Sequence, residues 1–487
     1  MALKSSRLSV DNFIKNASVK ECLSNLKSAF ENKPFIVSDV LDKENHQYVN
    51  LVQKGGGVLG IALVGYTYIL EEMGIRFIRL AGTSAGAINT ALMTVTGKKE
   101  EAKSLKILDI ICKLDFFNLV DGHPAARWLI KNFITHKDFT VQVKNFIAGI
   151  FITLASLLAA DFIFLGLQHS IPQVSVLTKA FFVSTGFFLL LVSILIAYIV
   201  TLLKRLKNSG FGINPGDYFY DWIKKQLIEN GVKTVTDLKE KAAEQVPDLY
   251  LRVPNTEGLN GLQGDVAFIA SELVTQNKIQ FPDMCNLFRK EEDIDTLQPA
   301  GFIRASMSIP VFFESYFIND IPCGDPGVKK EWEKLGEKDP PATARFVDGG
   351  ILSNFPINLF YNPKVITPRL PSFGIDLDDT KADDEGKRAQ SWSLGGYFYR
   401  IFNTIRFYYD KDFLIKNAFY KKGIGTIRLE GFNWLNFFLT DEDKIKMFVL
   451  GAQAAESFLK EFDWNDYKKD RNDMREQLRN EENATVK

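Results

Sequence analysis

The sequence predicts an α/β fold, because two strand-turn-helix units follow one another early in the chain and further strands alternate with helices after them. In the first unit, an extended run at residues 48–53 leads through a glycine turn into an apolar helical segment at residues 61–73. In the second unit, a short strand at residues 77–80 leads through a tight turn into a helical run at residues 87–93. Later strands are predicted at residues 249–254, 265–270, 345–348, 372–376 and 426–429. Strands that alternate with helices in this way are typical of α/β domains.

The composition narrows the possible functions. The chain has 487 residues, in which 59 Lys and Arg are balanced by 59 Asp and Glu. A general nucleic-acid-binding protein would normally carry a basic excess, so we predict no nucleic-acid partner. The cysteines and histidines show no metal-ligand spacing. This predicts free thiols in a reducing compartment and no bound metal.

Two long apolar runs interrupt the chain, from Phe146 to Leu167 and from Ala180 to Leu203. At about 1.5 Å per residue each run would form a helix of roughly 33–36 Å, enough for a hydrocarbon core of about 30 Å. Asp161 is the only charged residue inside them, and we expect it to reach the distal interface or to pair with His169. We predict a transmembrane hairpin; the alternative is a buried hairpin in a soluble domain.

The charges beside the hairpin predict its orientation. Basic residues lie on both outer flanks, whereas the connecting loop carries only Lys179; the flanking residues are Lys131, Lys137, Lys144, Lys204, Arg205 and Lys207. By the positive-inside rule, both flanks and both termini face the cytoplasm. The predicted location is therefore a membrane crossed twice, with the rest of the chain on the cytoplasmic, reducing side.

These observations divide the chain into five predicted parts. Residues 1–46 form an N-terminal helical extension, and residues 47–144 form the first part of the main domain. Residues 145–204 form the hairpin, residues 208–465 the second part of the main domain, and residues 466–487 a charged C-terminal tail, expected as solvated helix or disorder.

The glycine turn after the first strand reads Gly55-Gly56-Gly57-Val58-Leu59-Gly60 and fits the G-x-G-x-x-G pattern of dinucleotide sites. That function requires an acid near the end of the next strand, to bind the ribose. No acid occurs between Glu72 and Glu100, so the dinucleotide interpretation fails. Consecutive backbone N–H groups at a helix N-terminus can instead stabilise an oxyanion.

The second turn reads Gly82-Thr83-Ser84-Ala85-Gly86, a G-x-S-x-G sequence between a strand and a helix. This is the pattern of a nucleophile elbow, in which the flanking glycines leave room for a sharp turn that exposes the serine hydroxyl. Ser84 is therefore the candidate nucleophile. An oxyanion turn and an elbow on successive strand-helix units are far more specific together than either motif alone.

Ser84 needs a base, and no histidine follows His169 in the chain. A carboxylate within hydrogen-bond reach can take the serine proton instead. Asp348 is the best candidate, because it ends a predicted strand and is followed by Gly349 and Gly350. The alternative is a conventional Ser-His-acid triad that uses His46, His123 or His136 in an unusual chain order.

With these motifs, the sequence resembles the patatin-like phospholipase family. The resemblance rests on residues 55–60, 82–86 and 348–350, supported by Ala305-Ser306 with Ile309-Pro310 and by Asn354-Phe355-Pro356. It implies a three-layer α/β/α domain with a central, mainly parallel sheet, here interrupted by the hairpin. It also implies a serine–aspartate dyad without metal: Ser84 as nucleophile, Asp348 as base, and the amides of Gly55, Gly56 and Gly57 as the oxyanion hole. Leu59 stands where the family usually has Arg or Lys, so no cation is carried over there.

The predicted function is lipid acyl hydrolysis by a membrane-anchored enzyme of the phospholipase A or lysophospholipase type, without a cofactor. The expected partners are a lipid substrate and the bilayer; the oligomeric state is not predicted. Two alternatives stay open. One is a catalytically silent membrane scaffold or lipid-binding protein with the same fold, and the other is the Ser-His-acid esterase.

Overall fold

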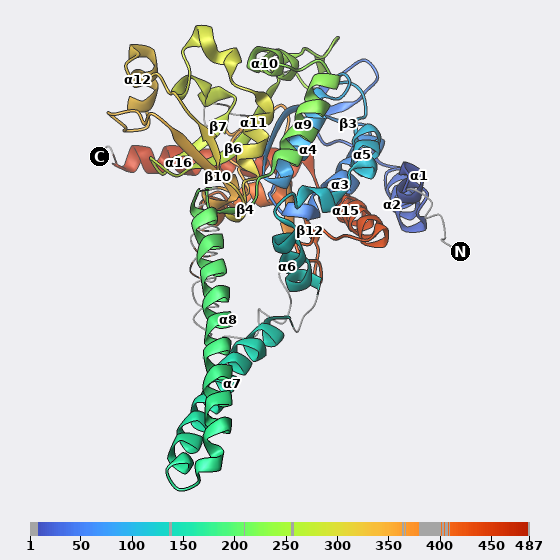
Figure 1. The fold of residues 1–487 in the computed structure, drawn as a ribbon. Coiled ribbons are helices and arrows are strands. Elements are labelled where there is room, and N and C mark those ends of the chain that lie inside the picture. Colours follow the sequence, from blue (N-terminus) through green and yellow to red (C-terminus); the bar gives the residue numbers. More distant parts are fainter. Residues whose placement is uncertain are drawn as a thin grey trace. The chain divides into compact units, whose positions relative to one another are not determined.

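The computed structural model describes residues 8–485, with gaps at 136–138, 209, 255–257, 363–364, 366, 379–400, 402–403, 405–407 and 409. The chain forms two compact units. The larger comprises Met1–Asp121, Gly216–Pro310 and Ser315–Lys487, and the smaller comprises Gly122–Pro215 and Val311–Glu314. Figure 1 shows their ribbon and labels many of the helices and strands.

In the described residues, a ten-stranded sheet forms the centre of the larger unit, with β12-β11-β2-β3-β6-β10-β9 as its main path. The neighbours from β12 to β6 are parallel, whereas β10 and β9 are antiparallel to theirs. The strands are β2 (Gln47–Gln53), β3 (Ile75–Thr83), β6 (Asp265–Glu272), β9 (Tyr316–Ile318), β10 (Ala344–Asp348), β11 (Ser372–Asp378) and β12 (Ile424–Arg428), with the short β1 (Val40–Leu41), β5 (Tyr250–Leu251) and β7 (Lys278–Phe281) beside them. The predicted α/β fold with a central, mainly parallel sheet is confirmed.

Helices cover both faces of this sheet. Successive side chains of a strand point to opposite faces, so neighbouring residues of β2 contact different helices. At the end of β2, Val52 packs in a cluster with Trp464 and Tyr467 of α16 (Trp464–Thr485). The next residue, Gln53, donates instead to Thr90 of α4 (Ala85–Val95) at 3.0 Å. On the same face as α4 lies α3 (Gly60–Glu72). It is apolar all round and buried along nearly its whole length, with α15 (Asp441–Glu461) packed against it.

The remaining helices of the larger unit surround these layers. Among the described residues they include α1 (Val10–Ile14), α2 (Ala17–Ala29), α5 (Ser104–Lys113), α9 (Asp217–Glu229), α10 (Val235–Ala243), α11 (Pro299–Ser306) and α12 (Pro326–Glu333). The tail expected to be solvated from residue 466 is helical, but its first turns are not solvated: Tyr467 and Arg471 are buried. Aromatic contacts explain the difference, since Tyr467 stacks on Trp464 and the Arg471 guanidinium lies over Tyr361.

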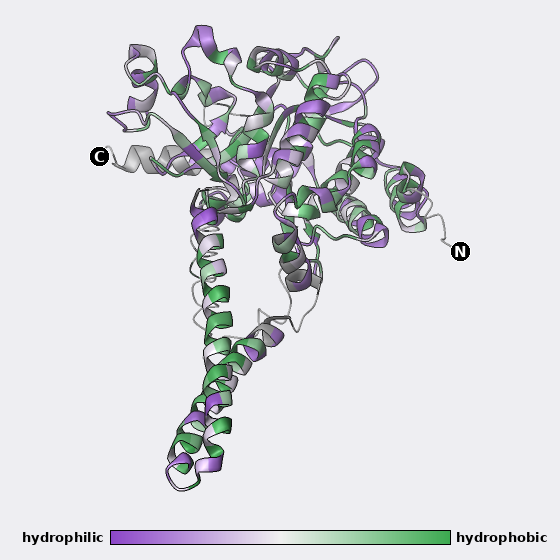
Figure 2. Ribbon diagram, in the orientation of Figure 1, coloured by the Kyte–Doolittle hydropathy of each residue, from purple (hydrophilic) through white to green (hydrophobic). Residues whose placement is uncertain are grey.

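The smaller unit contains α6 (Pro124–Thr135), the helices α7 (Phe139–Gln168) and α8 (Ser175–Asn208), and the strands β4 (Gly212–Asn214) and β8 (Val311–Phe313). α7 and α8 pack against each other as a hairpin, and apolar residues dominate both (Figure 2). Lys144–Gln168 and Pro172–Lys207 are long and apolar enough to cross a membrane. In the most apolar 18-residue stretch of each span, only 6% and 0% of the residues are buried, whereas the core helix of a soluble protein is mostly buried.

Asp161 of α7 lies inside this hairpin, and its side chain is buried. Thr178 and Thr185 of α8 are buried as well. No hydrogen bond joins Asp161 to His169 in the part of the chain that the structure describes. The expected pairing of these two side chains is therefore not formed, because the Asp161 carboxylate is enclosed between the helices.

Candidate active site

Ser84 occupies a one-residue turn between β3 and α4. Its backbone has φ 53° and ψ −120°, a conformation that non-glycine residues adopt only when the surrounding structure enforces it. The Ser84 N–H donates to Ser306 Oγ at 2.9 Å, and the Ser306 hydroxyl donates to the Ile269 carbonyl of β6 at 2.6 Å. The sharp turn is thus held from α11 and from the neighbouring strand.

The glycines on either side of Ser84 are required by close backbone approaches. A Cβ atom on Gly82 would collide with the Gly86 carbonyl, and one on Gly86 would collide with the Gln53 carbonyl at the end of β2. The elbow therefore lies directly against the start of the glycine turn that follows β2.

The glycine turn is held at both ends. Lys54 binds Asp376 of β11 at 2.6 Å, and the Val58 N–H donates to the Trp434 carbonyl at 3.0 Å. Gly57 has φ +56°, which favours glycine, and a Cβ atom there would also collide with the Trp434 carbonyl. A Cβ atom on Gly55 would lie 3.0 Å from Ser84 Cβ, so the turn and the proposed nucleophile are in contact.

The three predicted oxyanion donors are not equivalent. The Gly55 N–H donates to the Asn354 carbonyl at 3.0 Å, and Asn354 Nδ2 donates back to the Gly55 carbonyl at 3.2 Å. Within the described residues, the N–H groups of Gly56 and Gly57 make no hydrogen bond. They precede α3, where the helix dipole favours negative charge. Gly56 and Gly57 are therefore the donors available to an oxyanion in this conformation.

Asp348 ends β10 and is buried. Its carboxylate accepts the Gly350 N–H at 2.7 Å, and its own N–H donates to the Ser308 carbonyl at 2.8 Å. Gly349 follows directly and lies against the Ile269 carbonyl, where a Cβ atom would not fit.

The register of the sheet brings Ser84 and Asp348 to the same edge. Thr83 pairs with Ile269 on one side of β6, and Asp348 pairs with Ala270 on its other side. Two strand spacings separate the two residues, about 10 Å between Cα atoms. This placement at one edge of the sheet is compatible with a dyad of Ser84 and Asp348.

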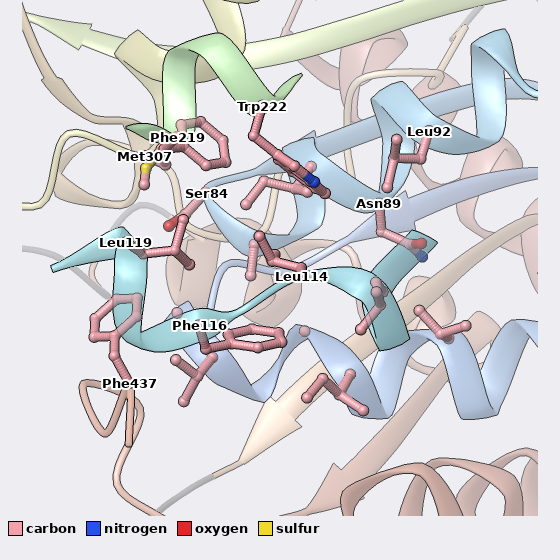
Figure 3. Close-up of a pocket in the computed structure, with 18 of the residues that line it drawn as sticks. Ser84, Asn89, Leu92, Leu114, Phe116, Leu119, Phe219, Trp222, Met307 and Phe437 are labelled. Atoms are coloured by element: carbon pink, nitrogen blue, oxygen red, sulfur yellow. The ribbon is translucent and has the colours of Figure 1, made fainter. Parts of the chain in front are cut away.

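An apolar pocket of about 70 Å³ adjoins Ser84 (Figure 3). Ser84 lies at one side of it, and Leu92 and Asn89 of α4 lie at the other. The pocket is lined largely by aliphatic and aromatic side chains, including Leu114, Phe116, Leu119, Phe219, Trp222 and Met307. Such a lining suits a hydrocarbon chain and excludes a charged group.

The other predicted site residues are placed as follows. Gly60 begins α3, where an added Cβ atom would lie 3.2 Å from Ala85 Cβ of the elbow helix, and Leu59 is buried. His46 precedes β2, at the sheet edge opposite Ser84, so it cannot serve as the base of a triad. His123 belongs to the smaller unit, and His136 lies outside the described residues.

One group in the described residues could hold a metal by its geometry: Asp42, Glu44 and His46. It lies at the edge of the sheet opposite Ser84, and His46 Nε2 is 3.2 Å from the Arg76 guanidinium. That cation disfavours a second positive charge there. The cluster has no part in the chemistry at Ser84.

Sequence reasoning missed one polar side chain behind the site, Asp410, and attached no role to Ser306 beyond its place in a motif. Asp410 accepts hydrogen bonds from residues 353–355, which contact the glycine turn. It follows a run of aromatic residues in the sequence. No local pattern marks it, since its partners lie 55–57 residues earlier.

Comparisons with known proteins add the following. Residues 51–361, more than half of the chain, match the sequence model of a family described as patatin-like phospholipase. The uncharacterized protein YqhO from Bacillus subtilis (strain 168) is 26% identical over 416 residues, which cover 85% of this chain and 99% of that protein. The crystal structure of VipD from Legionella pneumophila matches with 13% identity and a TM-score of 0.35, covering 88% of this chain and 71% of that chain. At that TM-score the likeness carries no argument.

Proposed function

Because this chain belongs to the patatin-like phospholipase family, we propose that it is a membrane-anchored serine hydrolase of glycerolipid acyl esters, with Ser84 as nucleophile and Asp348 as base. The observation that carries the proposal is the contact between the glycine turn and the elbow. An added Cβ on Gly55 would lie only 3.0 Å from Ser84 Cβ. Gly57 and Ser84 also line the same pocket, which supports a role for the Gly56 and Gly57 amides as donors to the carbonyl oxygen of an ester bound at Ser84.

In the proposed reaction, the ester carbonyl carbon lies at Ser84 Oγ and the acyl chain lies in the apolar pocket. Ser84 Oγ attacks while Asp348 accepts its proton, and the oxyanion is stabilised by the N–H groups of Gly56 and Gly57. The intermediate collapses to an acyl-enzyme as the alcohol leaves with the proton from Asp348. Water then attacks the acyl-enzyme, Asp348 takes its proton, and the fatty acid is released as Ser84 regains a proton.

The lipid substrate is supported by two features. The pocket beside Ser84 presents hydrocarbon over most of its wall, as an acyl chain requires. The hairpin formed by α7 and α8 exposes apolar side chains along nearly its full length. We propose that it spans the bilayer, with the two basic flanks and both termini on the cytoplasmic side.

A fluorophosphonate probe tests the mechanism on the detergent-solubilised full chain. We expect the wild-type protein to be labelled at Ser84 and to hydrolyse a fluorogenic lipid ester. Ser84→Ala should lose both activities, and Asp348→Asn should lower the rate of ester hydrolysis by about 10²-fold or more, as expected when a general base is lost. Undiminished hydrolysis by Ser84→Ala would refute the mechanism, and a folded wild-type protein that is never labelled would favour a silent scaffold.

A further inference from the structure

Asp410 presents a buried carboxylate to a single turn behind the proposed site. Its Oδ1 accepts the Ser353 hydroxyl at 2.9 Å, and its Oδ2 accepts the backbone N–H groups of Asn354 and Phe355, each at 2.8 Å. The side chain is 8% exposed. Hydrogen bonds to an ionised carboxylate are roughly twice as strong as neutral ones, so this one side chain fixes the conformation of residues 353–355.

The same turn contacts the three segments that carry the proposed chemistry. Asn354 exchanges two hydrogen bonds with Gly55, at 3.0 and 3.2 Å, directly before the proposed oxyanion donors. The Ser353 carbonyl accepts the Thr83 hydroxyl at 3.0 Å, directly before the nucleophile. The Ser353 N–H donates to the Gly349 carbonyl at 2.9 Å, directly after the proposed base.

We propose that Asp410 is a positioning residue for the reaction at Ser84. It holds the turn at residues 353–355, and this turn fixes the position of the glycine turn relative to the elbow. Its catalytic meaning rests on the proposed function. Asp410 contacts neither Ser84 nor the glycine amides, so it acts through Asn354 and Ser353. Oxyanion stabilisation depends on where the donors stand relative to the nucleophile, and a misplacement of about 1 Å can lower a rate by about 10²-fold.

The chemistry of the contact explains why a carboxylate is used. Three donors converge on this side chain, and without it two buried backbone N–H groups would lose their acceptor, which is destabilising. Burial also disfavours the charge itself, and it raises the pKa of the Asp410 carboxyl. Ionisable groups whose pKa is shifted by burial are common at functional sites. We therefore expect the hydrogen bonds of Asp410 to fix a backbone geometry that the reaction needs.

The test compares Asp410→Ala with Asp410→Asn. The asparagine Oδ1 can still accept the Asn354 and Phe355 N–H groups, and its Nδ2 can donate to the Ser353 hydroxyl, so it preserves the turn without the charge. Asp42→Ala is a matched control. Asp42 is also buried and accepts the Glu44 and His46 N–H groups and the Tyr48 hydroxyl, but it precedes β2 at the opposite edge of the sheet.

Each variant is measured for kcat and KM on a soluble ester, for thermal stability, and for amide hydrogen exchange in peptides that cover residues 54–60 and 82–86. For Asp410→Ala we expect kcat to fall by about 10- to 100-fold with KM within about twofold, and exchange to speed up in both peptides. Asp410→Asn should recover kcat to within a few-fold of wild type. Asp42→Ala should lose stability without either effect.

A folded Asp410→Ala protein with wild-type kcat and unchanged exchange would overturn the inference, because the contact would then be merely structural. If Asp410→Ala does not fold, Thr83→Val carries the test, since it removes only the hydrogen bond from Thr83 to the turn. Unchanged kcat and exchange in that variant would overturn the inference too. A wild-type protein without activity would refute the proposed function, whereas the exchange measurement would still decide whether Asp410 orders the two segments.

Discussion

Ser306 accepts the backbone N–H of Ser84 at 2.9 Å and donates its own hydroxyl to the Ile269 carbonyl at 2.6 Å. One buried hydroxyl therefore links the proposed nucleophile to the central strand β6. The Ser84 N–H stands at the start of α4, where it has no intrahelical acceptor. Without Ser306, a strained backbone would also carry an unsatisfied donor.

We expect Ser306→Ala to lower kcat by about tenfold or more and to destabilise the protein by about 1–3 kcal/mol, because the buried Ser84 N–H and Ile269 carbonyl both lose their partner. Ester hydrolysis and thermal unfolding measure the two effects.

Ser104→Ala is the matched control. Ser104 is as buried as Ser306, and its hydroxyl donates to Thr67 at 3.0 Å, in the contact between α3 and α5. This variant should lose stability and retain kcat; equal losses of kcat in both variants would contradict a specific role for Ser306.

Gly57→Ala should abolish hydrolysis. Its φ of +56° is unfavourable for an L-residue by about 1–2 kcal/mol, and the added Cβ would collide with the Trp434 carbonyl, which displaces the proposed oxyanion donors. Gly74→Ala separates the backbone effect from the collision, because Gly74 also has a positive φ, +77°, but has nothing within 4 Å of an added Cβ. We expect Gly74→Ala to lower the melting temperature and leave the fluorophosphonate labelling rate of Ser84 unchanged. Normal labelling of Gly57→Ala would argue against a role for this turn.

Asp410 predicts a pH dependence of stability. Burial raises the pKa of its carboxyl above the ordinary value of 3.8, so the folded protein binds this proton more tightly than the unfolded chain does. The contribution of this group to the free energy of unfolding is therefore greatest below 3.8 and falls as the pH rises through the folded-state pKa. Asp410→Asn cannot titrate. Its melting temperature should rise relative to wild type as the pH rises from 3.8 through the folded-state pKa of Asp410.

Asp42→Asn should show the opposite dependence. Burial alone would raise the pKa of Asp42, but hydrogen bonds from His46 and Tyr48 outweigh it and lower the pKa below 3.8. Wild type therefore gains stability from this group above 3.8 and loses it as the pH falls through the folded-state pKa. The melting temperature of Asp42→Asn should fall relative to wild type as the pH rises through that acidic window. Differences from wild type that stay constant with pH in both variants would contradict the assigned directions.

The strands and helices around Ser84 could be predicted from local sequence patterns, because a few neighbouring residues indicate each of them. Glycine at 74 ends α3 with φ +77°, as its position after the apolar run suggests. The strand predicted at residues 77–80 is longer, Ile75–Thr83, because Gly82 and Thr83 look like turn residues but pair with Gln53 and Ile269 in the sheet. The turn is confined to Ser84 alone.

The arrangement of the site depends on contacts that no local pattern shows. Three glycines in sequence look equivalent as oxyanion donors, yet Asn354, far along the chain, takes the Gly55 N–H and leaves Gly56 and Gly57. Asp410 resembles any acid in an aromatic helix until the fold brings it to the turn at residues 353–355. Motif spacing predicted which segments meet, whereas the division of hydrogen bonds among them follows from tertiary packing.

The hairpin provides the last prediction, since its membrane insertion depends on an uninterrupted apolar surface. Leu190 and Ile194 are 55% and 56% exposed near the middle of α8, so lysine at both positions would place two charges in the hydrocarbon core. Each lysine near the centre of a span costs about 2.5–3.5 kcal/mol on insertion scales. After alkaline extraction of membranes, the double variant should no longer be found in the membrane pellet. Its labelling at Ser84 in detergent should persist. Val176→Lys with Leu177→Lys is the matched control, because these residues are 74% and 50% exposed next to the hairpin loop, where lysine can reach water. Continued membrane insertion of the central double variant would show that α8 does not cross the hydrocarbon core.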